Sequence, residues 1–368
     1  MTAPTIAPPR DLPALTGLRF LVAFWVVLFH CEKLIVGIEG YLPLMHQGYL
    51  GVDFFFLLSG FILAHVYGAR FATGERGLWP RFVWLRFARI WPAYAVALAG
   101  LAGFDVAQQF LDAGAVRIEP GPWLTELAVH AAMLQSWGLG DANRFNIPGW
   151  SVSSEWLAYV LFPILGFIAL VVRSFVGRLV FIALATLAIW YPYWRYGGSD
   201  LNHIGWLALP RLGGEFLIGV LVRAMLPDAA TVDAKRRGDL ALVLGLGGAV
   251  VLLPTLFRPV PVGDALALPL FALAIWGAAH DGPLARRLLA APGILFLGEA
   301  SYSVYLMQNL PIAITGTIGK RLGVVDDPLW IGGRVGLVML AAVALGCLLY
   351  VLVEKPARAW LRRIGPRG

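Results

Sequence analysis

Hydrophobic residues dominate this chain in long runs that are separated by short polar or basic connections. A membrane-spanning helix needs roughly 20 mostly apolar residues, and the chain offers about ten such runs. With approximate bounds, these runs cover residues 16–37, 49–68, 84–104, 155–172, 178–194, 205–225, 239–257, 263–279, 294–315 and 331–353. The pattern predicts an all-α polytopic integral membrane protein with about ten transmembrane helices.

A further apolar stretch, residues 123–137, is short and carries Glu126 and His130. We expect an interfacial or re-entrant helix here. An eleventh span at this point would place most of the later basic loops on the opposite side of the membrane, against the positive-inside rule.

Basic residues set the predicted orientation. With the N-terminus in the cytoplasm, most of the 29 Lys and Arg residues fall on the cytoplasmic side, as the positive-inside rule requires. Both termini are then cytoplasmic. We divide the chain into a loose tail over residues 1–14, a membrane domain over 15–358 and a basic tail over 359–368.

Composition supports a membrane protein and excludes other classes. The chain has 368 residues, of which 59% are hydrophobic and 14% charged, far from the values of soluble domains. The net charge of +7 follows from loop topology, so we expect no nucleic-acid partner and a lipid bilayer instead. Cys31 and Cys347 lie in apolar runs, so no disulfide framework or metal site is expected.

The first apolar run contains Arg19 and His30, which lie about three helical turns and 16 Å apart on one face. Arg19 could simply snorkel to lipid headgroups. His30 is harder to explain structurally, because ionisable groups at membrane depth are costly and usually face an interior cavity. A backbone carbonyl could also satisfy it.

Three further charged residues are predicted near the outer half of the bilayer with His30. Asp53 suits a helix N-terminus and could also orient the His30 imidazole. Glu155 lies at the outer end of a span, and Arg211 is expected to pair with Glu215, four residues later. An arginine inside the membrane boundary points to a water-filled cavity.

Arg86 and Arg89 lie one helical turn apart at the predicted cytoplasmic face. They could be ordinary positive-inside anchors. Alternatively, they form a two-pronged site for phosphate, which arginine binds in bidentate fashion. The polar span LGEASYSVYLMQNLP, residues 297–311, must face protein or water, and Glu354 could pair with Lys355 or Arg358.

Taken together, these motifs resemble the acyltransferase-3 family of bacterial integral-membrane O-acyltransferases, over about Leu15 to Arg358. The resemblance rests on seven motifs in the family order: Arg19-x10-His30, GVDFFFLLSGF at 51–61, Arg86-x2-Arg89, WSVSSEW at 150–156, RLGGEFLIG at 211–219, LGEASYSVYL at 297–306 and EKPAR at 354–358. Family members commonly have a histidine at the position of Gln308, so that residue would here only form hydrogen bonds, or the substrate differs. Some relatives also carry a fused extracytoplasmic SGNH-hydrolase-like domain. The chain ends at Gly368, soon after its last predicted span, so we expect it to act alone or with a separate partner.

The resemblance implies transfer of an acyl group, most often acetyl, from cytoplasmic acyl-CoA to a hydroxyl of a glycan or another extracytoplasmic acceptor, in a bacterial inner membrane. His30 would be the general base, since its ordinary pKa suits that task. Asp53 or Glu155 would fix its tautomer. Arg86, Arg89 and Arg19 would hold the donor. We assign acceptor binding to five residues: Trp150, Ser151, Arg211, Tyr302 and Gln308.

The rival class is a transporter or flippase, which would use the same buried charges as a proton or substrate relay. It predicts substrate movement without covalent change. A scaffold or sensor does not account for polar groups at two matched depths. Direct attack and relay through an acyl-histidine both stay open, and the sequence gives no oligomeric state.

Overall fold

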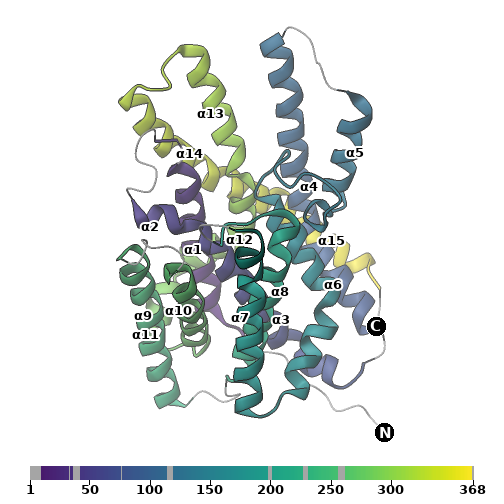
Figure 1. The fold of residues 1–368 in the computed structure, drawn as a ribbon, viewed down its shortest axis with the longest axis vertical. Helices are drawn as coiled ribbons and strands as arrows, with labels where there is room; N and C mark the ends of the chain where they lie inside the picture. Colours follow the sequence, from purple (N-terminus) through teal and green to yellow (C-terminus); the bar gives the residue numbers. More distant parts are fainter. Residues whose placement is uncertain are drawn as a thin grey trace.

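A computed structural model describes residues 10–32, 34–35, 42–75, 77–113, 119–197, 201–226, 231–255 and 262–366. Helices account for nearly all of these ranges, and no strand occurs within them. Eight long helices carry the fold (Figure 1): α1 (Pro13–Glu32), α3 (Gly51–Ala72), α4 (Leu78–Ala113), α6 (Gly149–Val171), α7 (Phe175–Tyr196), α8 (Leu209–Ala224), α9 (Val232–Thr255) and α14 (Pro328–Leu349).

In the described part of the chain, eight helical segments are long and apolar enough to cross a membrane. A ninth is added if α10 (Val262–Ala279) and α11 (Pro283–Leu289), which are bent by 100°, count as one span. The predicted all-α polytopic class is confirmed. The predicted count of about ten compares with eight or nine within the described ranges.

The predicted span 294–315 is not among these eight or nine segments. This segment breaks at Gln308 into α12 (Pro292–Met307), of 16 residues, and α13 (Asn309–Leu322), of 14 residues. Each is shorter than a bilayer-spanning helix. Pro311 explains the break, because it has no N–H to donate to the carbonyl of Met307, and its ring clashes with that turn.

The stretch predicted not to span the membrane forms α5 (Pro120–Ala131), a helix of 12 residues, followed by the short turn η2 (Gln135–Trp137). Twelve residues rise only about 18 Å, so α5 cannot cross a bilayer core of about 30 Å. In Figure 1, α4 and α5 project together at the upper right, opposite α13 at the upper left. Two further short elements, α2 (Pro43–His46) and η1 (Gln47–Leu50), precede α3.

Close helix crossings hold the bundle together. α1 lies near its centre and packs against α12, α3, α10 and α14, while α3 packs along α8 and α9 along α10. At the α3–α8 crossing, a Cβ on Gly60 would lie 2.0 Å from the Phe216 carbonyl oxygen, and one on Gly219 would lie 1.9 Å from that of Leu57. These two glycines bring the backbones into contact, as membrane helix interfaces require.

The end of α14 contains an irregular turn. The π-helix η4 (Tyr350–Glu354) joins α14 to α15 (Lys355–Ile364). A π-turn adds one residue per hydrogen-bonded ring and so rotates the following side chains relative to a regular helix. It faces Glu354 into the bundle, where the carboxylate is fully buried.

Candidate functional site

A cavity of about 340 Å³ opens between α1, α3, α4, α6 and α12. Arg19, Arg86, Arg89 and Glu155 all line it. Its α1 wall is a stripe of Leu15, Thr16 and Arg19, positions that share one helix face. The chain before α1, Arg10 to Leu12, also lines the cavity, so this part of the predicted loose tail has a defined place.

Arg86 is held by aromatic rings. Its guanidinium carbon lies 5.3 Å from the ring centre of Tyr67, 5.8 Å from that of Phe82 and 6.0 Å from that of Tyr159. Its Nη2 donates to the Tyr67 hydroxyl at 3.2 Å. Its buried Nε has no hydrogen-bond partner within the described ranges. Cation–π contacts orient the fork without neutralising its charge, so a donor remains available for an anion.

Arg89 is held by an acid. It forms an ion pair with Glu354, whose carboxylate also accepts from the Ser303 hydroxyl at 2.7 Å. The guanidinium lies over the Tyr302 ring, 5.5 Å from its centre. The predicted pairing of Glu354 with Lys355 or Arg358 is therefore wrong, because the π-turn faces this carboxylate toward α4.

Arg19 differs from both. Its half-buried side chain makes no hydrogen bond or ion pair with any residue that the structure describes. Glu155, Glu299 and Arg358 act on it electrostatically from nearby. Arg19 therefore brings to the cavity a positive charge that no described residue contacts through a hydrogen bond or ion pair.

Glu155 lies among these arginines. Its Oε1 accepts from the Tyr159 hydroxyl at 2.6 Å and from the Ser59 hydroxyl. The sequence placed Glu155 with Asp53 and Arg211, and that grouping is wrong. A single turn of α6 brings Glu155 and Tyr159 together, and Ser59 lies on the facing side of α3.

Asp53 and Arg211 form a separate, closed cluster. Arg211 Nε donates to Asp53 Oδ1 at 2.7 Å, and Nη2 contacts Oδ2. Glu215 lies 3.4 Å from Arg211 Nε, which confirms the predicted pair, and Nη1 donates to the Leu201 carbonyl. Asp53 is 0% exposed and Arg211 2%. The predicted use of Asp53 to orient His30 is wrong, since Arg211 engages both its oxygens.

His30 lies toward the far end of α1 from Arg19. Its Nδ1 is 2.9 Å from the Val26 carbonyl oxygen, and its ring packs edge-on against Phe29 at 5.1 Å. It is not among the described residues that line the cavity. Residues 36–41, which follow α1, lie outside the described residues. The helix face that carries both residues therefore lines the cavity at Arg19 but not at His30.

The predicted acceptor residues separate into two groups. Ser151 and Tyr302 line the cavity, where the Ser151 hydroxyl lies 2.7 Å from that of Tyr305. Trp150 instead covers the closed cluster, with its ring 5.9 Å from the Arg211 guanidinium carbon. Gln308 is fully buried at the break between α12 and α13, and its amide has no hydrogen-bond partner in the described structure.

The sequence did not single out His65, Ser59, Tyr159 and Tyr305 as site residues, although all four line the cavity. His65 Nε2 lies 2.8 Å from the Arg10 carbonyl oxygen, and its Nδ1 accepts from Arg223 Nε at 3.0 Å. A histidine in an apolar run was a usable signal, identical in kind to that of His30. The three hydroxyls carried no such signal, because only the fold brings them together.

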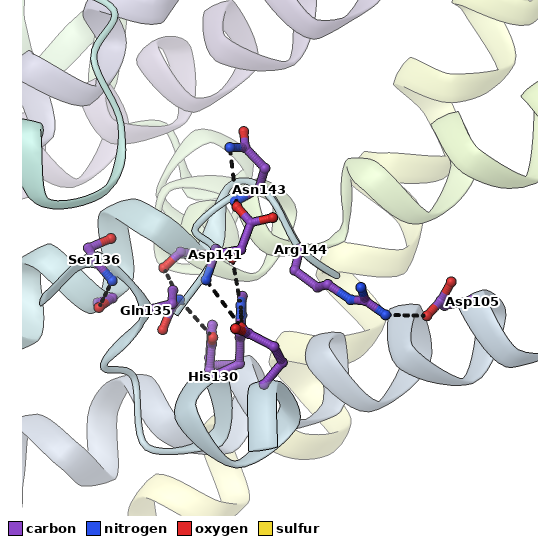
Figure 2. Close-up of polar contacts among 11 residues, drawn as sticks. Asp105, His130, Gln135, Ser136, Asp141, Asn143 and Arg144 are labelled. Carbon is purple, nitrogen blue, oxygen red and sulfur yellow. Dashed lines mark hydrogen bonds and ion pairs between the residues drawn. The ribbon is translucent and has the colours of Figure 1, made fainter. Parts of the chain in front are cut away.

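The loop between α5 and α6 positions the start of α6 (Figure 2). Gln135 Nε2 donates to the Tyr94 hydroxyl at 3.0 Å and to the Gly149 carbonyl at 2.8 Å. The Ser136 hydroxyl donates to the Trp150 carbonyl at 2.8 Å. His130 Nε2 lies 3.0 Å from the Asp141 carbonyl oxygen. Burial lowers the pKa of His130, so it is neutral at pH 7.

Comparison with known proteins decides the class. A family model described as an acyltransferase domain, acyltransferase-3, matches residues 12–353. The chain belongs to this acyltransferase family. The family name confirms the resemblance seen in the seven motifs and identifies the protein as an enzyme, in place of the rival transporter.

Individual relatives agree. The acyltransferase MdmB of Streptomyces mycarofaciens is 29% identical over 98% of this chain and 95% of its own length. The O-acetyltransferase OatA of Staphylococcus aureus is 24% identical over 83% of this chain, which spans 51% of that protein. Protein 2 in the picA locus of Rhizobium radiobacter is 39% identical over 27% of this chain and 49% of its own length. No solved structure matches the chain.

Proposed function

We propose that this membrane acyltransferase moves an acyl group, acetyl in the simplest case, from acyl-CoA to a hydroxyl of a glycan or another extracytoplasmic acceptor. The observation that carries the proposal is a cavity lined by four arginines, Arg10, Arg19, Arg86 and Arg89, among which Arg86 keeps a buried Nε without a hydrogen-bond partner in the described ranges. A relative that bears the name O-acetyltransferase supports oxygen as the acceptor atom.

The donor fits the residues present. CoA carries phosphates, which a guanidinium binds as a fork, and Arg86 Nε is a buried donor without a partner. The cavity volume of about 340 Å³ is at the small end for ligand sites. Its apolar walls, which include Phe55, Phe56 and Leu63, suit a pantetheine arm and an acyl group. The phosphates would stay at the mouth.

The chemistry requires a base. The acceptor hydroxyl loses its proton to His30, and its oxygen forms a bond to the thioester carbonyl carbon. The C–S bond breaks, and the CoA thiolate takes the proton from the imidazolium, so atoms and charge balance. His30 lies about 16 Å along α1 from Arg19, a distance that a long extended arm has to bridge. An acyl-histidine relay gives the same net reaction.

Glu155 positions the cavity wall. It holds the hydroxyls of Ser59 and Tyr159, and the Tyr159 ring faces Arg86. Through these contacts, it fixes where the Arg86 fork lies.

The proposed location is a bacterial inner membrane. With the N-terminus cytoplasmic, as the basic loops predict, the side of the cavity that Arg10 and Asp11 line, just before α1, faces the cytoplasmic pool of acyl-CoA. The His30 end of α1 then faces the acceptor side.

The test uses purified protein in vesicles that contain acetyl-CoA labelled in its acetyl group, with a glycan fraction from bacterial cells outside. We expect base-labile labelled ester to appear on the glycan with wild-type protein and with Gly68→Ala, since nothing lies within 4 Å of a Cβ there. His30→Ala is expected to abolish it. Normal transfer by a correctly inserted His30→Ala protein would overturn the base assignment, and no transfer by the wild type would overturn the donor and acceptor.

A further inference from the structure

The C-terminal helix α15 carries four basic residues and no acidic one within Lys355–Ile364. The sequence alone treats it as an ordinary basic stop. In the structure, it packs against α4, the helix that carries Arg86 and Arg89. Trp84 Nε1 donates to the Leu361 carbonyl at 2.8 Å. A Cβ on Gly365 would lie 2.2 Å from the Trp84 ring, so the Gly365 backbone lies directly against the indole.

Two of its arginines lie within electrostatic range of the cavity arginines. Arg358 and Arg362 are four residues apart and therefore share one face of α15. Arg358 acts electrostatically on both Arg19 and Arg89, and Arg362 is influenced by Arg86. Five arginines thus lie within electrostatic range of one another: Arg19, Arg86 and Arg89, which line the cavity, and Arg358 and Arg362, which lie on α15 beside it.

The acids nearby do not neutralise this group. Glu354 is paired with Arg89 and Ser303, and Glu299 accepts a hydrogen bond from the Tyr350 hydroxyl at 2.5 Å. Glu155 takes the hydroxyls of Ser59 and Tyr159. Neither Arg358 nor Arg362 makes a hydrogen bond or ion pair with any residue in the described ranges. The positive charges of these arginines repel one another, and a bound polyanion would remove that repulsion.

We propose that Arg358 and Arg362 form the outer part of a phosphate site whose inner part is Arg86 and Arg89. The ligand class is a nucleotide with several phosphates joined to a long arm, and the assignment rests on the proposed acyl-CoA donor. The π-turn supports it, because Glu354, one turn before Arg358, ties the start of α15 to Arg89. Lipid headgroups offer the same phosphate chemistry, so the test separates the two sources.

The experiment measures equilibrium binding of CoA to purified full-length protein in nanodiscs of neutral lipid. Arg358→Ala/Arg362→Ala is compared with Arg363→Ala, which removes one charge from an exposed position on a neighbouring face of α15. We expect the double variant to weaken CoA binding about a hundredfold, about tenfold for each charge-assisted contact. Arg363→Ala should change it less than about twofold. An unchanged melting temperature in all three proteins shows that the fold is kept.

Transfer from a second acyl donor distinguishes phosphate binding by Arg358 and Arg362 from a purely structural role of these residues. Acetyl-pantetheine lacks the nucleotide phosphates, so its transfer rate should be equal in the wild type and the double variant. Equal CoA binding by the double variant and Arg363→Ala would overturn the inference. So would a binding defect that appears only in nanodiscs with anionic lipid, because the arginines would then serve headgroups. Wild-type protein that neither binds CoA nor transfers from it would instead overturn the proposed function itself.

Discussion

Arg211 and Arg86 both lie in helical segments that are long and apolar enough to cross a membrane, but their surroundings differ. Arg211 meets Asp53 through two nitrogens, Glu215 at 3.4 Å and the Leu201 carbonyl, and it is 2% exposed. Arg86 meets aromatic rings and one hydroxyl, retains an unpartnered Nε and lines a cavity.

The difference separates structure from binding. A charge whose hydrogen-bonding capacity is filled by the protein stabilises the helices that supply its partners. A charge held by rings, with donors left over, is prepared for a ligand. We therefore assign the Arg211 cluster to the α3–α8 interface and the cavity arginines to the donor.

The largest expected effect comes from breaking the closed cluster. Arg211→Ala leaves Asp53 and Glu215 buried without a cation, which should cost about 3–5 kcal/mol of unfolding free energy. Thermal unfolding in detergent measures the loss. The matched triple variant Arg211→Met/Asp53→Asn/Glu215→Gln removes all three charges and should recover most of it. A melting temperature for Arg211→Ala close to that of the wild type would contradict a structural role.

The next largest effect is expected at the α3–α8 crossing, where the Arg211 cluster lies. Gly219→Ala places a Cβ 1.9 Å from the Leu57 carbonyl oxygen, so α3 and α8 must move apart, at a cost of about 1–3 kcal/mol. Gly68→Ala in α3 has open space and should be neutral or up to about 1 kcal/mol stabilising, since alanine is the better helix former. Equal melting temperatures for the two variants would show that the crossing is less tight than described.

A conservative change at the cavity should affect the donor and leave stability alone. Arg86→Lys keeps the charge but loses the planar fork and its ring contacts. We expect KM for acetyl-CoA to rise about tenfold with kcat within about twofold, as for a lost phosphate contact. Steady-state rates of CoA release measure both constants. A drop in kcat at unchanged KM would place Arg86 in the chemical step.

The smallest effect concerns the polar network in the loop of Figure 2, which includes His130. Burial lowers the pKa of His130 from its ordinary value of 6.5, so the stability it contributes is full above pH 6.5. This stability falls as pH drops through 6.5 toward the folded-state pKa. The hydrogen-exchange protection factors of residues 132–148, which correct for the pH dependence of intrinsic amide exchange, should therefore be lower at pH 5.5 than at pH 7.5. His130→Gln should remove this pH dependence, and a pH dependence that persists in the variant would assign it to another group.

The sequence predicted the helical membrane class and the family. It also predicted that Arg19, Arg86, Arg89 and Glu155 are site residues. Hydropathy identifies spans because length and apolarity are local properties. Hydropathy missed the interruption between α12 and α13 at Gln308, where Pro311 removes one backbone hydrogen bond although Gln308 keeps helical dihedral angles.

Partner choice was predicted less well. Asp53 and Glu155 were grouped by depth, yet one pairs with Arg211 and the other faces Arg19 and Arg86. Depth along a helix says nothing about which face meets which neighbour, because that depends on helix rotation and crossing. The π-turn that faces Glu354 toward Arg89 has no sequence signature.

The most direct test of the account is the affinity of the purified protein for acetyl-CoA, since it requires no knowledge of the acceptor. Equilibrium dialysis with labelled acetyl-CoA would compare the wild type, Arg86→Ala and Arg363→Ala. The cavity account predicts that Arg86→Ala binds at least about tenfold more weakly, while Arg363→Ala matches the wild type. Equal affinity in all three proteins would contradict it, because the donor would then bind away from the arginine-lined cavity.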